Sequence, residues 1–183
     1  MKMITLPLFV LSLSALNLQA ATTLTVASGE VKFTAIGKPG FLKIKGESKE
    51  KFPTGAIKIE NGNASGNFEF DLKSLDTGIN LRNDHMKDKY LQVGQYPTAQ
   101  LSIKSFPIEE KDLNTNFKKR FKGTLTLHNV TKDINGDIEY TASSKKTLAH
   151  FTIKVSDFKI DVPQYMGVTV SETVDIETSL QFK

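Results

Sequence analysis

The sequence has 183 residues, no cysteine and a formal net charge of +4. The absence of cysteine excludes disulfide bonds, thiolate catalysis and cysteine-ligated metals. The net charge is small and the basic and acidic residues are interspersed, so the composition gives no reason to expect nucleic-acid binding.

Residues 1–20 are predicted to be a secretory signal peptide. Met1-Lys2 is weakly positive, residues 4–16 are mainly apolar, and Leu18-Gln19-Ala20 is typical of a cleavage site. No cysteine follows that could carry a lipid anchor. We therefore expect residues 21–183 to form one soluble domain in the periplasm, with no integral membrane segment.

The first part of the mature chain alternates apolar and polar residues with period two, which is typical of half-buried strands. Such segments begin at Leu24, Phe41, Ile57 and Phe68. Composition predicts a turn at residues 37–40. Asn61-Gly62-Asn63 predicts a tight hairpin, because Asn and Gly tolerate the positive φ that this turn requires.

One segment interrupts the strands, between Thr77-Gly78 and Pro97. Its apolar residues approximate the spacing of one helical face. They are Leu81, Met86, Tyr90 and Leu91. This pattern predicts one short helix in a crossover. We expect the specific function of the protein to be located at that helix.

Strand patterns resume after Pro97 and continue to the end of the chain. They include residues 117–127, a long run at 148–160 and a last one at 168–182. Short connections and the lack of βα repeats predict an antiparallel all-β meander that closes into a barrel. A barrel of about eight strands is either filled by side chains or holds one small ligand. The 12 Phe and the absence of Trp leave both alternatives open.

The sequence resembles the YceI family of secreted lipocalin-like proteins along the whole mature chain. The stretches that carry this resemblance are Leu75-Asp76-Thr77-Gly78, Arg82-Asn83-Asp84-His85-Met86, Tyr90-Leu91, Tyr96-Pro97, residues 123–132, Asp157-Phe158 and residues 170–176. Three positions depart from the family pattern. Asn83 stands in place of Asp, Asn129 in place of Gly, and Lys159 in place of Gly. Asn129 should preserve its turn, since Asn tolerates the left-handed region.

The resemblance implies an extended antiparallel lipocalin-like barrel with one short helix, whose tunnel holds a long apolar chain. The expected ligand is a polyisoprenoid, or a quinone or fatty-acyl derivative, held for carriage or storage without a cofactor. Apolar positions that read as inward-facing would line the tunnel. They are Phe33, Ile57, Ile59, Phe68, Phe70, Leu75, Leu81, Met86, Leu91, Leu101, Ile103, Leu125, Leu127, Ile138, Tyr140, Phe151, Ile153, Phe158, Met166, Val170, Val174 and Ile176.

Arg82 and His85 lie three residues apart in the predicted helix and are candidates for binding a ligand head group. Arg offers a forked donor to phosphate, and His a second donor that responds to pH. The alternative is a structural cluster in which Arg82 pairs with Asp84 or Asp88 and His85 caps or packs. His128 and His150 are isolated on predicted strands, and no spacing indicates a metal site.

Two other classes of function remain as alternatives. One is an enzyme that modifies an isoprenoid lipid through His85 and a neighbouring carboxylate. The sequence contains no nucleophile elbow or Gly-rich phosphate loop, so we expect no enzyme. The other is a ligand-free interaction module with a role in stress. Whether two copies form a homodimer stays open.

Overall fold

The computed structural model describes residues 21–39, 42–165 and 167–183, so the expected signal peptide at 1–20 lies outside the described residues. The strands are β1 Thr22–Lys38, β2 Leu42–Ser48, β3 Thr54–Glu60, β4 Asn63–Asp71, β5 Leu75–Asp76, β6 Thr98–Pro107, β7 Phe117–Leu127, β8 Val130–Thr141, β9 Lys146–Lys154, β10 Gln164–Tyr165 and β11 Val168–Phe182. The helical segments are η1 Leu72–Ser74, α1 Asn80–Asp84, η2 His85–Tyr90, η3 Glu110–Asn114, η4 Ala142–Ser144 and η5 Val155–Phe158.

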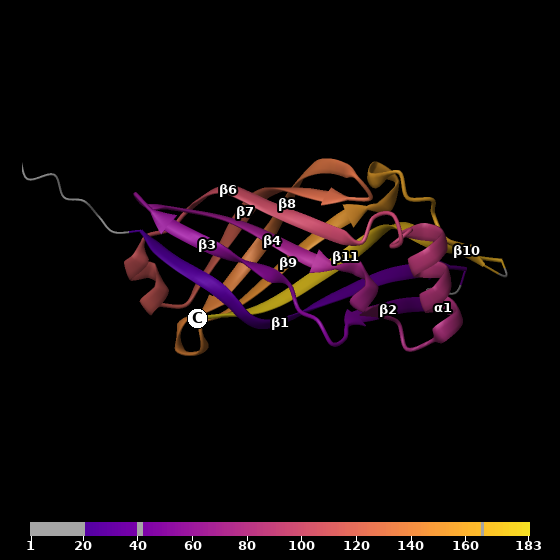
Figure 1. The fold of residues 1–183 in the computed structure, drawn as a ribbon, viewed down its shortest axis with the longest axis horizontal. Helices are drawn as coiled ribbons and strands as arrows, with labels where there is room; N and C mark the ends of the chain where they lie inside the picture. Colours follow the sequence, from indigo (N-terminus) through magenta and orange to yellow (C-terminus); the bar gives the residue numbers. More distant parts are fainter. Residues whose placement is uncertain (1–20, 40–41, 166) are drawn as a thin grey trace, which may run out of the picture.

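Eight long strands form a closed antiparallel barrel (Figure 1). Their order is β1-β3-β4-β6-β7-β8-β9-β11, and β11 pairs back with β1 from Val26 to Lys38. Closure leaves no long unpaired edge in this ring, which suits strands with no other edge protection. The predicted all-β barrel with one short helix is confirmed.

The barrel wall is extended at one end because β1 changes partner. Residues 22–25 of β1 pair with β3, whereas residues 32–37 pair with β2. β2 in turn pairs with β5, and the short β10 pairs with β11. Helix α1 lies at this end, which we call the α1 end, and the C terminus lies at the opposite end (Figure 1).

Two tight hairpin turns have positive φ at both central residues. Asn61 and Gly62 have φ of 52° and 76° and join β3 to β4, as the sequence predicts. His128 and Asn129 have φ of 51° and 56° and join β7 to β8. Asn129 therefore keeps its turn. His128 lies in the turn and not on a strand, so its predicted placement is wrong, whereas His150 lies exposed on β9.

Two predicted elements differ from the structure. The crossover helix is divided, with five residues of α1 followed directly by the π-helical η2. The predicted strand at residues 148–160 ends at Lys154 and continues as the single turn η5. That turn closes with Lys159 at a φ of 57°, the conformation that Gly adopts most readily. Phe158 therefore lies in this turn and not on β9.

No helix in the described ranges combines the length and the apolar character that crossing a membrane requires.

Candidate functional site: an apolar cavity in the barrel

The barrel encloses a cavity of about 580 Å³. Its wall extends from Leu24 and Phe182 near the C-terminal end to Leu42 and Leu81 at the α1 end. The volume falls within the roughly 300–1,000 Å³ of small-molecule sites, which are mostly apolar with a few polar groups. Of the two alternatives that the sequence left open, the structure has the hollow barrel.

Every predicted tunnel residue lies on the cavity wall except Phe158 and Met166. Met166 lies outside the described residues. Phe158 is only 1% exposed but is not on the wall, because it belongs to η5 and not to a strand, so its predicted role in the lining is wrong. That the other residues bind a ligand stays a prediction.

The wall also contains apolar residues that the sequence analysis did not select. Several of them share a strand face with predicted residues, so the same alternation would have identified them. These are Val31, Ala35, Ala99, Phe121, Ala149 and Leu180. Ile108 and Leu113 lie between strands, at the C-terminal end, and no periodicity identifies them.

The cavity opens at the α1 end. Leu42, Ile79 and Leu81 line it there, yet they are 54%, 52% and 52% exposed. At the opposite end the lining residues are buried or half-buried, including Phe106 and Phe182 at 3% and 7%. We call the opening at the α1 end the mouth and the opposite end the closed end.

Arg82 and His85 both line the cavity near the mouth, so the structure brings the two head-group candidates together. Nη2 of Arg82 donates a hydrogen bond of 2.6 Å to the carbonyl oxygen of Thr77. Within the described ranges, Arg82 forms no ion pair with Asp84 or Asp88, so that part of the structural alternative is wrong.

The Nε atom of Arg82 is buried and has no hydrogen-bond partner among the described residues. A buried donor without an acceptor costs about 1–3 kcal/mol, and more when the group is charged. Arg82 is also one of the residues that line the cavity. A water molecule or an oxygen of a bound ligand would both satisfy the Nε donor.

A hydrogen-bond network fixes the start of α1 and, with it, the position of Arg82. Asn83 Nδ2 donates to Asp76 Oδ1 at 2.6 Å, and Asn83 Oδ1 accepts from Thr77 N at 2.8 Å. Lys49 forms an ion pair with the other Asp76 oxygen. Hydrogen bonds from Lys49, Asn83 and Gly78 N hold the pKa of Asp76 well below its usual range.

Tyr90 connects the end of η2 to β10 across the mouth. Its hydroxyl accepts a hydrogen bond from Gln164 N at 3.2 Å and lies 3.4 Å from Gln164 O. Gln164 also lines the cavity. The last turn of the crossover is thereby held to a segment 74 residues further along the chain.

His128 lies away from the cavity wall, with ring nitrogens 3.2 Å from Phe158 O and 3.3 Å from Gln92 Oε1. Its ring also contacts Tyr96 edge to face. Nowhere in residues 21–39, 42–165 and 167–183 do three His, Asp or Glu side chains gather as metal ligands would.

Comparison with known proteins adds the following findings. The family model for the YceI-like domain matches residues 16–182. A polyisoprenoid-binding domain from Saccharophagus degradans has a similar structure, with a TM-score of 0.63, 17% identity, and coverage of 87% of this chain and 97% of that one. BcnA of Burkholderia cenocepacia is also similar, with a TM-score of 0.61, 19% identity, and coverage of 82% of this chain and 94% of that one. For a mutant CJ YCEI protein the TM-score is 0.53 and the identity 20%, with coverage of 77% of this chain and 87% of that one. No curated protein matches the chain.

Proposed function

The chain belongs to the family of YceI-like domains, and from that premise we propose that it is a lipid-binding protein that holds a long isoprenoid chain, polyprenyl or quinone-type, inside its barrel for carriage or storage. The observation that carries the proposal is the apolar cavity, closed at one end and open at the mouth. The structurally similar domain from Saccharophagus degradans is described as polyisoprenoid-binding, which supports the same ligand class.

Burial of apolar surface supplies enough free energy for such a ligand. Ten buried methylene equivalents contribute about 8 kcal/mol at about 0.8 kcal/mol each, which corresponds to a gross dissociation constant near the micromolar range. Association costs reduce this figure, and a longer chain offsets them. The shape and length of the cavity would then set selectivity.

The two ends of the cavity give the ligand a direction. The closed end is lined by Phe106, Tyr140 and Phe182, which suit a hydrocarbon tail. The mouth holds Arg82 and His85, and the buried Arg82 Nε–H would be satisfied by an oxygen of the ligand. We therefore place the tail at the closed end and an oxygen-bearing head group at the mouth.

We also propose that residues 1–20 direct export to the periplasm and that residues 21–183 are the functional domain. The chain then acts by shielding an apolar molecule from water and not by catalysis. The sequence contains no nucleophile elbow or Gly-rich phosphate loop that would support catalysis.

Solvent extraction of natively purified protein tests the proposal. Mass spectrometry of the extract should detect one class of apolar molecule at close to one molecule per chain. Protein stripped with detergent serves as the control and should release none. An extract without lipid, from protein that also fails to take up added polyprenol or quinone after stripping, would contradict the proposal.

A further inference from the structure

The mouth of the cavity presents apolar side chains to solvent. Leu42 comes from β2, Ile79 directly precedes α1, and Leu81 lies within α1. In the described ranges, four large hydrophobic residues are exposed, and these are three of them. The fourth, Phe52, does not line the cavity. Exposed apolar surface is thus concentrated where a lipid would enter.

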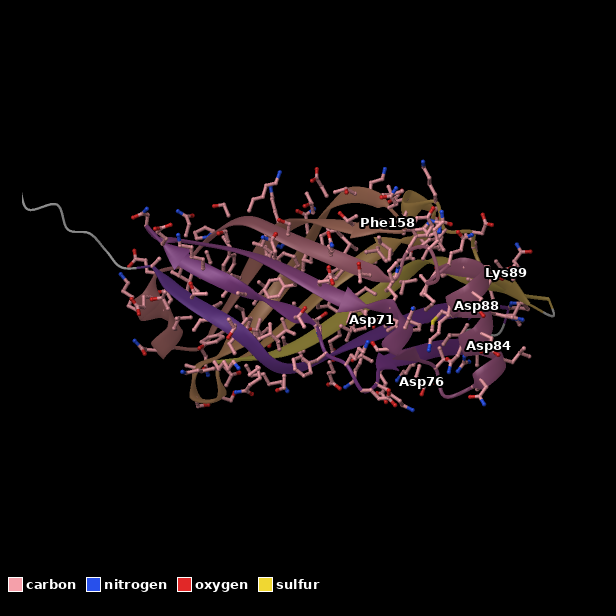
Figure 2. All side chains as sticks on the ribbon, in the orientation of Figure 1. Asp71, Asp76, Asp84, Asp88, Lys89 and Phe158 are labelled. Atoms are coloured by element: carbon pink, nitrogen blue, oxygen red, sulfur yellow. The ribbon has the colours of Figure 1, made fainter. Side chains whose placement is uncertain are left out.

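Positive charge is concentrated around the same opening. Residues 38–48 and 79–90 contain six basic and three acidic side chains, a net charge of +3. The basic residues are Lys38, Lys43, Lys45, Arg82, Lys87 and Lys89. β2, α1 and η2 carry most of them, and Figure 2 shows Lys89 beside the acidic pair Asp84 and Asp88 at the α1 end.

These basic groups have no ion-pair partner among the residues that the structure describes. Nine other basic side chains form an ion pair, most of them on the barrel wall. Lys43 and Lys45 alternate with Leu42 and Ile44 along β2, so the cations flank residues of the cavity wall. An apolar rim surrounded by unpaired cations is complementary to an anionic lipid surface.

We propose that the mouth docks on an anionic phospholipid bilayer. Leu42, Ile79 and Leu81 enter the interfacial layer, and the surrounding ammonium groups contact lipid phosphates. A lipid tail then passes between the bilayer and the cavity without crossing water. This transfer step rests on the proposed function, whereas the docking itself does not.

Sedimentation with vesicles tests the docking. One set of vesicles contains only phosphatidylcholine, and the other contains phosphatidylcholine with phosphatidylglycerol. The full chain should sediment with the mixed vesicles, less so as salt rises, and weakly with the neutral ones. Equal partition into both kinds of vesicle, or into neither, would overturn the proposal.

Matched variants locate the contact. Lys43→Glu with Lys87→Glu should lower the partition coefficient by at least about tenfold, since each cation near an anionic surface contributes about fivefold. The exposed barrel-wall pair Lys104→Glu and Lys122→Glu makes the same change in net charge and should lower it far less. Ile79→Ser with Leu81→Ser should also reduce binding, whereas Phe52→Ser should not. Mouth variants that bind as well as their controls would contradict the proposal.

Lipid content measured in the same samples separates this proposal from the proposed function. Protein that sediments with the mixed vesicles but never carries an apolar molecule would support docking and defeat the carrier role. Protein that carries its lipid but sediments with neither kind of vesicle would support the carrier role and contradict the docking.

Discussion

The side-chain amide of Asn83 donates a hydrogen bond of 2.6 Å to the carboxylate of Asp76, which joins helix α1 to strand β5. The amide oxygen of Asn83 accepts from both the backbone N–H and the hydroxyl of Thr77, at 2.8 Å and 2.7 Å. Position 83 therefore needs a donor and an acceptor at once. Asn provides both, whereas an ionised Asp provides only acceptors.

Asn83→Asp is expected to destabilise this chain. A carboxylate at position 83 would lose the donor to Asp76 and place two like charges in contact, while the bonds from Thr77 could persist. Thermal unfolding at neutral pH should show a lower midpoint than that of the original protein. The difference between the two unfolding midpoints should become smaller in acid, because protonation of either carboxylate restores a donor. A difference that does not change with pH would show that repulsion is not its cause.

Asp76 should make folding stability depend on pH in the acidic range. Its pKa in the folded state lies below the unfolded value of about 3.9, chiefly because of the hydrogen bond from Lys49. The stabilisation is therefore fully present above that unfolded value and is lost as the pH falls through the lower, folded pKa. Asp76→Asn should reduce stability at neutral pH, and the difference from the original protein should vanish in strong acid. Chemical denaturation of both proteins across this pH range measures the difference in their free energies of unfolding.

Gly136 is expected to tolerate no side chain. It pairs across strands with Phe121, and an added Cβ would overlap the Phe121 ring and lie 2.5 Å from the carbonyl oxygen of His150. Gly136→Ala should cost about 1–3 kcal/mol. In a domain of this size, that lowers the unfolding midpoint by about 2–4 °C for each kcal/mol.

Gly94→Ala is the matched control, because a Cβ added at Gly94 meets no described atom within 4 Å beyond its chain neighbours, and its φ is not positive. Its unfolding midpoint should stay close to that of the original protein. Equal effects of the two substitutions would show that the close approach of Phe121 and Gly136 does not limit stability.

The strand pattern predicted most of the cavity wall, because period-two alternation indicates which side chains of a strand face inward. Phe151 and Ile153 on β9 are examples, since both were predicted and both line the cavity. Phe158 was also predicted to line the tunnel, although its even position departs from the alternation of Phe151 and Ile153. The strand had already ended at Lys154, and one turn of helix redirects the side chain. The turn closes on Lys159 and not on Gly, so no turn residue marks the end of the strand. Periodicity alone therefore cannot reveal where the strand ends.

The details of the mouth could not be predicted, because they depend on contacts between distant parts of the chain. Nothing in the sequence indicates that β1 exchanges β3 for β2, yet this places Leu42 on the rim. The sequence offered Asp84 and Asp88 as partners for Arg82. The structure instead pairs the guanidinium with the carbonyl of Thr77, because Asn83 and Asp76 fix that loop beside it.

Arg82 should discriminate between ligand head groups. Hydrogen bonds to charged groups contribute about 1.5–3 kcal/mol, so Arg82→Met should weaken binding of a polyprenyl phosphate about 10- to 150-fold. Binding of a polyprenyl hydrocarbon without a head group should change little. Fluorescence titration of stripped protein with both ligands measures the difference.

Arg120→Met is the control for Arg82→Met, because Arg120 is a second arginine whose side chain is 91% exposed on β7 and is absent from the cavity wall. It should bind both ligands like the original protein. An equal loss for the two ligands in Arg82→Met would indicate that Arg82 holds the crossover in place and does not bind the head group.

The length of the cavity should determine the length of the chain that the protein accepts. Ala149 lies on β9, three residues from the start of that strand at the closed end, and its side chain faces the cavity. Ala149→Trp would place an indole across the closed end, where the cavity offers it room, so stability should change little. Titration with polyprenols of increasing length should show reduced affinity for the long chains and retained affinity for the short ones. His150→Trp introduces the same side chain one residue later, on the exposed face of the strand, and should leave the length profile unchanged. If both variants accept long chains equally well, the tail does not extend to the closed end, and the ligand must lie in another direction.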